Sequence, residues 1–239
     1  MFEQLTNLLD QNQIFNTSTL LTYWDGFVVT CQLVFISLVI GLVFSVPLAV
    51  LRTSSRKWIS GPIWFYTYIF RGTPLLVQLY VIYYGVIFIN GIQESIFWPL
   101  AKNALYPTLL AFTLNTAAYT TEILRGAIIA TPRGEIEAAK AYGMSRFVTI
   151  KRILLPSAFR RALPAYSNEV IFMLHASSIA SVVTIVDLTG AARDVYSKYY
   201  APFEAFFFVA MLYLLLTFLI IYVFKQLEKN MLAHLRPLS

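Results

Sequence analysis

A single acidic side chain, Glu169, lies within an apolar stretch that follows the basic pair Arg160 and Arg161. A carboxylate in apolar surroundings costs several kcal/mol unless it faces a cavity or a partner of opposite charge. The sequence has no basic residue one helical turn from Glu169. A cationic ligand could supply the counter-charge, so we interpret Glu169 as a candidate binding residue. A structural charge that pairs with another helix is the alternative.

A second group of polar side chains follows one face of the apolar stretch at residues 105–125. At 100° per residue, four polar residues share a sector of about 60°: Thr108, Asn115, Tyr119 and Glu122. Asn115 lies near the middle of this stretch, where a polar group without partners is costly. We therefore expect this face to contact protein or water rather than lipid.

The other ionisable residues in or near apolar stretches have simpler explanations. His175 could relay protons, but a buried, hydrogen-bonded neutral histidine is the simpler interpretation. Glu122 precedes Arg125 by three residues, which predicts an ion pair on one helix face. Asp187 and Asp194 are the only acidic pair worth testing for metal, and no Cys or His supports them. We therefore predict no metal site and no catalytic residue.

The composition indicates a membrane protein. Of the 239 residues, 58% are hydrophobic and only 13% are charged, and the mean hydropathy is +0.67. An ordinary soluble domain does not carry this much apolar surface. Cys31, the only cysteine, supports neither a disulfide nor a metal cluster. No Gly-x-x-x-x-Gly-Lys-Ser/Thr motif is present, so the chain itself should not hydrolyse ATP.

The apolar pattern predicts an all-α fold with several membrane crossings. A crossing needs about 20 predominantly apolar residues. Five stretches fit this requirement, at residues 26–51, 74–92, 105–125, 163–185 and 202–224. We expect two shorter helices between them, an interfacial one at 58–72 and an external one at 186–201.

Basic residues give the predicted topology its orientation. The first crossing ends at Arg52, Arg56 and Lys57, which places its far end in the cytoplasm by the positive-inside rule. The N-terminus is then outside and the C-terminus inside. Only three of the eighteen basic residues are external in this topology: Lys102, Arg193 and Lys198. Topology therefore accounts for the net charge of +6, and no nucleic-acid partner is needed.

The same reading divides the chain into three parts. Residues 1–25 form an exported polar lead without a cleavable signal, residues 26–228 form one membrane domain, and residues 229–239 form a cytoplasmic tail.

The longest internal polar loop, at residues 131–156, predicts a pair of short helices. Thr131 can cap a helix over 132–142, and Gly143 can end it. Ser145 can cap a second helix that runs to Pro156. Three residues of the first helix region share one face by their i, i+3, i+7 spacing: Ile136, Ala139 and Gly143.

The loop resembles a known family motif in its residues and spacing. Glu137-Ala138-Ala139, then Gly143 after three residues, then Ile153-Leu154-Leu155-Pro156, are similar to the EAA loop of permease subunits in bacterial ABC importers. The run Phe70-Arg71-Gly72-Thr73-Pro74 resembles a signature of the polar amino acid branch, although a helix start with Thr73 as cap explains it equally well. The runs 110–116, 118–123 and 162–170 are similar to the M-type permease subunits of histidine and arginine importers.

This resemblance implies a fold, a location and a set of partners. It implies the type I ABC importer fold in a bacterial inner membrane, paired with an identical or homologous permease. It also implies two ATPase subunits, which hold ATP and Mg, and a periplasmic binding protein that delivers an amino acid. The chain itself would carry no cofactor.

The resemblance also implies two sets of functional residues. The first would dock on the ATPase: Ile136, Glu137, Ala138, Ala139 and Gly143. The second would bind a basic amino acid such as arginine, histidine, lysine or ornithine: Glu169, Asn115, Tyr119 and Ser167. The expected function is a non-enzymatic permease subunit that works by alternating access. An ion-coupled secondary amino acid transporter and an integral membrane enzyme are the alternatives.

Overall fold

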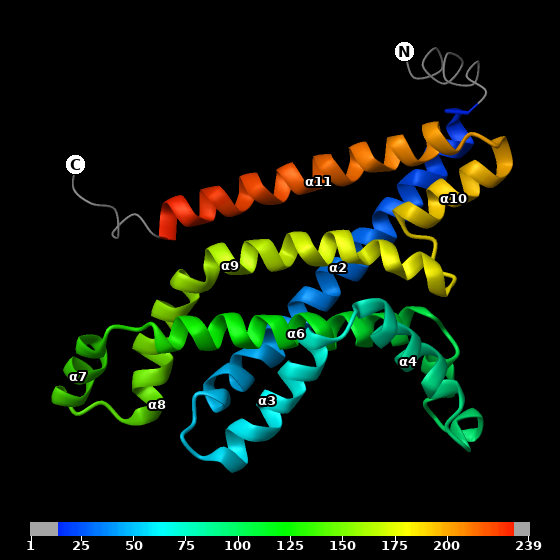
Figure 1. Ribbon diagram of the computed structural model, residues 1–239. Coiled ribbons are helices and arrows are strands. Elements are labelled where there is room, and N and C mark those ends of the chain that lie inside the picture. The colour runs from blue at the N-terminus through cyan, green and yellow to red at the C-terminus, as the bar shows by residue number, and fades with distance from the viewer. Residues whose placement is uncertain (1–13, 232–239) are drawn as a thin grey trace. The chain divides into compact units, whose positions relative to one another are not determined.

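The computed structural model describes residues 14–231, and every regular element in that range is a helix (Figure 1). Residues 1–13 of the predicted lead and residues 232–239 of the predicted tail lie outside the described range, whereas residues 17–25 of the lead belong to the first long helix. The elements are α2 (Thr17–Arg52), α3 (Lys57–Gly72), α4 (Leu75–Ile87), η1 (Ile92–Glu94), α5 (Trp98–Ala101), α6 (Leu105–Ile129), α7 (Arg133–Ala141), α8 (Arg146–Thr149), η2 (Ile150–Leu154), α9 (Leu155–Ala176), η3 (Ser177–Val183), α10 (Leu188–Tyr199) and α11 (Pro202–Met231).

Two helices in this range, α2 and α11, are long and apolar enough to cross a membrane. A third crossing is added if α8 through η3 and the bent continuation α10 are taken as one span. Helix α4 is apolar but short, and α6 carries the polar face described above. The all-helical prediction is therefore confirmed for the described residues, whereas the number of crossings remains a prediction.

The chain forms two compact units. Of the described residues, the first contains 14–37, Leu76–Ala111 and Phe172–Phe218, and the second contains Leu38–Leu75, Phe112–Ile171 and 219–231. In the first unit, the Tyr23 hydroxyl donates to the Ala205 carbonyl at 3.1 Å. The Leu188 amide donates to the Thr30 hydroxyl at 3.0 Å, which ties α2 to the start of α10.

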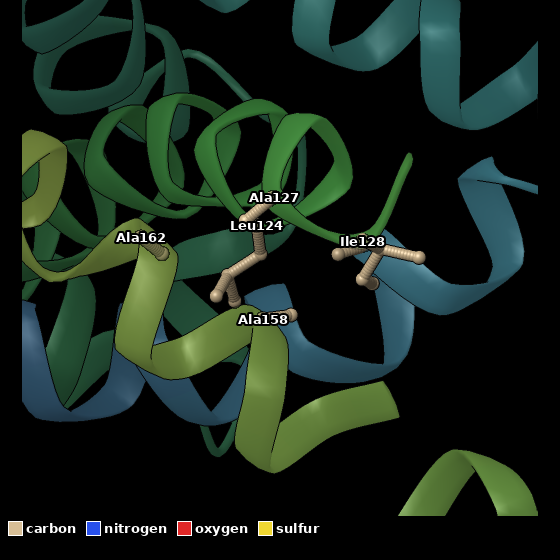
Figure 2. Packing of buried hydrophobic residues seen from close by; sticks show 6 residues of the cluster. Leu124, Ala127, Ile128, Ala158 and Ala162 are labelled. Atoms are coloured by element: carbon tan, nitrogen blue, oxygen red, sulfur yellow. The ribbon is translucent and has the colours of Figure 1, made fainter. Parts of the chain in front are cut away.

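Close packing of small side chains holds the second unit together. Ala158 and Ala162 of α9 face Leu124 and Ala127 of α6, as Figure 2 shows. Alanines four residues apart form a flat helix face that a neighbouring helix can approach closely. A further contact joins α3 to α6, since the Tyr66 hydroxyl donates to the Leu114 carbonyl at 2.6 Å.

Several predicted boundaries differ from the structure. Helix α2 begins at Thr17 rather than residue 26, and α4 ends at Ile87. The helix that begins after Ser145 does not stop at Pro156, which lies in the first turn of α9. Proline has no amide hydrogen and its ring crowds the preceding turn, and the wider π-helical turn η2 just before α9 relieves both problems.

The first loop helix is confirmed within one residue at each end, but its predicted cap is wrong. Helix α7 follows Pro132, and no side chain caps it. The Thr131 hydroxyl instead accepts a hydrogen bond from Arg161 at 2.8 Å. Gly143 does end the helix, and Ser145 caps α8 by accepting from the Val148 amide.

Candidate functional site

The end of α3 meets α6 through side-chain hydrogen bonds within the second unit. The last four carbonyl groups of a helix have no partner inside that helix. Asn115 Nδ2 donates to the Phe70 carbonyl at 3.3 Å, and the Tyr119 hydroxyl donates to the Arg71 carbonyl at 3.3 Å. Two of the residues predicted to contact a ligand therefore also cap the end of α3.

Arg71 brings a positive charge to this junction. Its guanidinium carbon lies 5.4 Å from the centroid of the Tyr119 ring, within cation–π range. The same guanidinium interacts electrostatically with the Glu169 carboxylate of α9. No helical periodicity in the sequence connects Arg71 to Glu169, because the two lie on different helices. The signature at Phe70–Pro74 was the signal that could have identified Arg71.

Glu169 is buried beside this junction, with only 5% of its surface exposed. Thr116 of α6 is its polar neighbour. Within residues 14–231, neither Glu169 Oε1 nor Thr116 Oγ1 makes a hydrogen bond of standard geometry. An ionised carboxylate accepts hydrogen bonds only. Glu169 therefore offers an acceptor to a donor-rich, positively charged group.

Ser167 has the weakest geometric support among the four predicted ligand residues. Its hydroxyl donates to the Pro164 carbonyl at 2.8 Å and is thus engaged within its own helix. Its role in binding remains a prediction.

A glycine on α2 lets that helix approach α6 next to Glu169. A Cβ atom placed on Gly41 would lie 2.5 Å from Cγ2 of Thr116, which is too close for an ordinary contact. Glycine at position 41 therefore permits this close approach of the two helices. Thr116 thus packs closely against α2 and also lies beside the Glu169 carboxylate.

We predict that Gly41→Ala lowers the free energy of unfolding by about 1–3 kcal/mol, because the added methyl group overpacks this contact. Thermal unfolding of the purified protein in detergent measures the change. Thr116→Ser removes Cγ2, so the double variant should recover most of the loss. Gly61→Ala, with no atom within 4 Å of the added Cβ, is the control. Equal stability of Gly41→Ala and the wild type would contradict the packing.

The predicted docking residues lie on two sides of α7. Ala139 is 1% exposed and packs inward, and Ile136 is half-buried. Glu137 and Ala138 are exposed. Tyr142, directly after α7, and Phe147, within α8, expose 84% and 72% of their surface. These two aromatic side chains were not predicted, although large exposed apolar groups beside a motif are a recognisable signal of a contact surface.

Gly143 ends α7 in a left-handed conformation, with φ of 69°. The Gly143 amide donates to the Lys140 carbonyl at 2.9 Å, and the Met144 amide donates to the Ala139 carbonyl at 3.0 Å. This hydrogen-bond pair is a Schellman motif, which favours glycine at its left-handed position. The glycine thereby fixes the turn between α7 and α8.

The predicted ion pair of Glu122 is confirmed and is part of a larger cluster. Glu122 Oε2 accepts from Arg125, and Oε1 lies 3.2 Å from Arg52 Nε. The Thr67 hydroxyl also donates to Oε1 at 3.0 Å. One carboxylate thus links α2, α3 and α6. This structural role explains the presence of a charged residue at position 122 without a role in transport.

In the first unit, His175 and Asp187, which were considered for proton relay and for metal binding, each make hydrogen bonds that explain them structurally. His175 Nε2 lies 3.0 Å from the Thr217 hydroxyl, so the expected hydrogen bond is present, although His175 is exposed rather than buried. Asp187 caps α10 by accepting from the Gly190 amide at 2.9 Å. Among residues 14–231, no group of three His, Cys, Asp or Glu side chains could hold a metal ion.

A family model described as "Binding-protein-dependent transport system inner membrane component" matches residues 37–233. The chain is 49% identical over 217 residues to the histidine/lysine/arginine/ornithine transport system permease protein HisM of Escherichia coli (strain K12), covering 90% of this chain and 91% of the relative. It is 40% identical over 215 residues to the octopine transport system permease protein OccM of Rhizobium meliloti, covering 90% and 88%.

Solved structures share the fold. A chain in the crystal structure of an amino acid ABC transporter with histidines matches with a TM-score of 0.76 and 32% identity, covering 87% of this chain and 94% of that chain. A chain of the MetNI methionine ABC transporter in an inward-facing conformation matches with a TM-score of 0.75, covering 90% and 99%. Its identity is 18%, so it supports the fold alone.

Proposed function

Because the chain belongs to the family of binding-protein-dependent transport system inner membrane components, we propose that it is the permease subunit of an ATP-driven importer of basic amino acids. The named substrates of HisM are histidine, lysine, arginine and ornithine. A likeness over nine-tenths of the chain supports the same substrate class here.

The observation that carries the proposed substrate is the buried Glu169 carboxylate, with Oε1 unengaged among the described residues. A basic amino acid offers an ammonium or guanidinium group that matches it in charge and in hydrogen-bond donors. Arg71 places a positive charge of the protein itself near this carboxylate. A cationic substrate that binds Glu169 must therefore compete with Arg71 for the carboxylate.

The proposed assembly follows the family. The chain crosses a bacterial inner membrane five times, with its N-terminus outside and its C-terminus in the cytoplasm. It pairs with an identical or homologous permease, and two ATPase subunits dock on the loop at 131–156. A periplasmic binding protein delivers the amino acid. ATP and Mg bind to the ATPase, and this chain carries no cofactor. The chain is embedded in the lipid bilayer and binds no nucleic acid.

The proposed mechanism is alternating access. ATP binding closes the ATPase pair, and α7 follows the movement of the surface on which it docks. The membrane helices then open the cavity outward, and hydrolysis returns it inward. A ligand shifts such an equilibrium only through unequal contacts with the two states. In this chain, the unequal contact with the ATPase is made at residues 136–143.

Family membership does not favour an ion-coupled secondary transporter. The two mechanisms differ in their energy source, so reconstitution separates them. We expect the complex purified through this subunit, with its binding protein, to take up radiolabelled arginine into proteoliposomes only when ATP is enclosed with the ATPase. Uptake should continue after addition of an uncoupler. Uptake without ATP that collapses with the uncoupler would contradict the proposed function.

A further inference from the structure

Helix α7 has little apolar contact with the rest of the second unit. Among its nine residues only Ala139 is fully buried, and a methyl side chain buries little area. The buried contact of Ala139 alone is too small to fix the orientation of α7. Whatever holds α7 in place against a moving partner must come from other contacts.

A group of four polar residues supplies these contacts. The Arg161 guanidinium donates to the Thr131 hydroxyl at 2.8 Å and to the Ser157 hydroxyl at 2.7 Å. The Ser157 hydroxyl donates to Glu135 Oε2 at 3.0 Å, and Arg161 Nη1 lies 3.9 Å from Glu135 Oε1. We call these four residues the Arg161 clamp.

The clamp joins three helices at one point. Thr131 follows the end of α6, Glu135 is in the first turn of α7, and Ser157 and Arg161 belong to α9. Negative charge in the first turn also suits the positive end of the α7 dipole. The planar guanidinium, with several donors at fixed angles, can hold all three partners in one geometry.

The covalent path from α7 to α9 is less direct than the clamp. It passes through the left-handed turn at Gly143, the four-residue helix α8 and the π-helical turn η2. Each of these short elements can absorb movement. The clamp bypasses them and connects α7 directly to the first turns of α9.

Helix α9 extends from the clamp to the candidate binding carboxylate. It is α-helical from Leu155 to Ala176 and continues through Pro164. Arg161 and Glu169 are two residues of this one helix, about 12 Å apart along its axis at 1.5 Å per residue. A displacement of its first turns therefore reaches Glu169 without crossing a loop.

We propose that Arg161 is the positioning residue that transmits movement of α7 to α9 and thereby to Glu169. This inference rests on the proposed function, since it requires an ATPase that moves α7. Arg161 contacts neither the ATPase surface nor the substrate in this role. Its loss should uncouple ATP hydrolysis from transport rather than prevent either partner from binding.

The test uses the full complex in proteoliposomes, with arginine uptake and ATP hydrolysis measured on the same vesicles. We expect Arg161→Ala to lower uptake per ATP hydrolysed about tenfold, while the ATPase still co-purifies and hydrolyses ATP. Arg161→Lys should restore part of the ratio. Arg160→Ala is the matched control, because this exposed neighbour lies on the same helix and outside the clamp, and its ratio should equal that of the wild type.

An unchanged ratio in Arg161→Ala would overturn the inference, and so would loss of ATPase co-purification, which would make Arg161 a docking or folding residue. If Arg161→Ala fails to insert, Ser157→Ala decides, because it removes the hydroxyl that bridges Glu135 and Arg161 and leaves only their 3.9 Å ion pair. A ratio several-fold below wild type supports the clamp, and a wild-type ratio rejects it. Failure of the proposed function itself would show differently, as absence of ATP-driven arginine uptake in the wild-type complex.

Discussion

Glu169→Gln is expected to reduce ATP-driven uptake of arginine about a hundredfold or more. Removing one partner of a buried ion pair costs about 3–5 kcal/mol, and each 1.4 kcal/mol is a factor of ten in affinity. The glutamine keeps the size of the side chain but offers a neutral amide to the cation. The nearby Arg71 guanidinium would then repel the substrate without a compensating carboxylate.

Initial uptake rates in proteoliposomes measure this effect over a range of arginine concentrations. Asn168→Ala is the matched control, because this residue is exposed and lies beside Glu169 on α9. It should leave uptake unchanged. ATPase co-purification should stay normal in both variants, which separates a binding defect from a failure to assemble. Wild-type uptake kinetics in Glu169→Gln would refute the assigned site.

Gly143→Val is expected to abolish ATP-driven uptake by preventing the ATPase from docking. Gly143 has φ of 69°, and a left-handed conformation costs an ordinary side chain about 1–2 kcal/mol. A β-branched residue increases this strain, so the Schellman motif should break and the turn should reorient α7 relative to α8. Co-purification of the ATPase should fall below detection, while the permease remains in the membrane fraction.

Gly134→Ala provides the control within the same loop. An added Cβ has no atom within 4 Å at either glycine, but only Gly143 has a positive φ. Alanine at 134 is therefore compatible with α7 and should leave docking intact. Glu137→Lys, which reverses an exposed charge of α7, should also abolish docking without strain in the turn. Normal recovery of the ATPase with both Gly143→Val and Glu137→Lys would show that this surface does not bind it.

Local features of this chain were predictable because they depend on neighbours in sequence. The extent of α7, its end at Gly143 and the Ser145 cap follow from residues a few positions apart. The pair Glu122–Arg125 follows from i, i+3 spacing on one helix. A glycine just after the end of a helix and a serine just before its start are residue types that can be recognised at fixed positions in the sequence.

Contacts between helices were not predictable in the same way. Asn115 and Tyr119 were identified as polar residues that need a partner, but their partners are backbone carbonyl groups of α3, which have no signature in sequence. In the sequence, Arg161 is one of two basic residues that precede an apolar stretch. Its contacts with Thr131 and Glu135 depend on how α6, α7 and α9 pack. Periodicity indicates which face is polar and not which helix it meets.

The hydrogen bonds at the end of α3 restrict where this molecule can hinge. Asn115 and Tyr119 occupy the Phe70 and Arg71 carbonyls, and Tyr66 occupies the Leu114 carbonyl in return. Pulling α3 away from α6 would break all three hydrogen bonds, each of which contributes about 0.5–1.5 kcal/mol. The two helices should therefore travel as one rigid body. The small side chains of Ala158 and Ala162 add only apolar contacts between α9 and α6. Movement of α9 relative to α6 is therefore limited at one end by the hydrogen bond from Arg161 to Thr131.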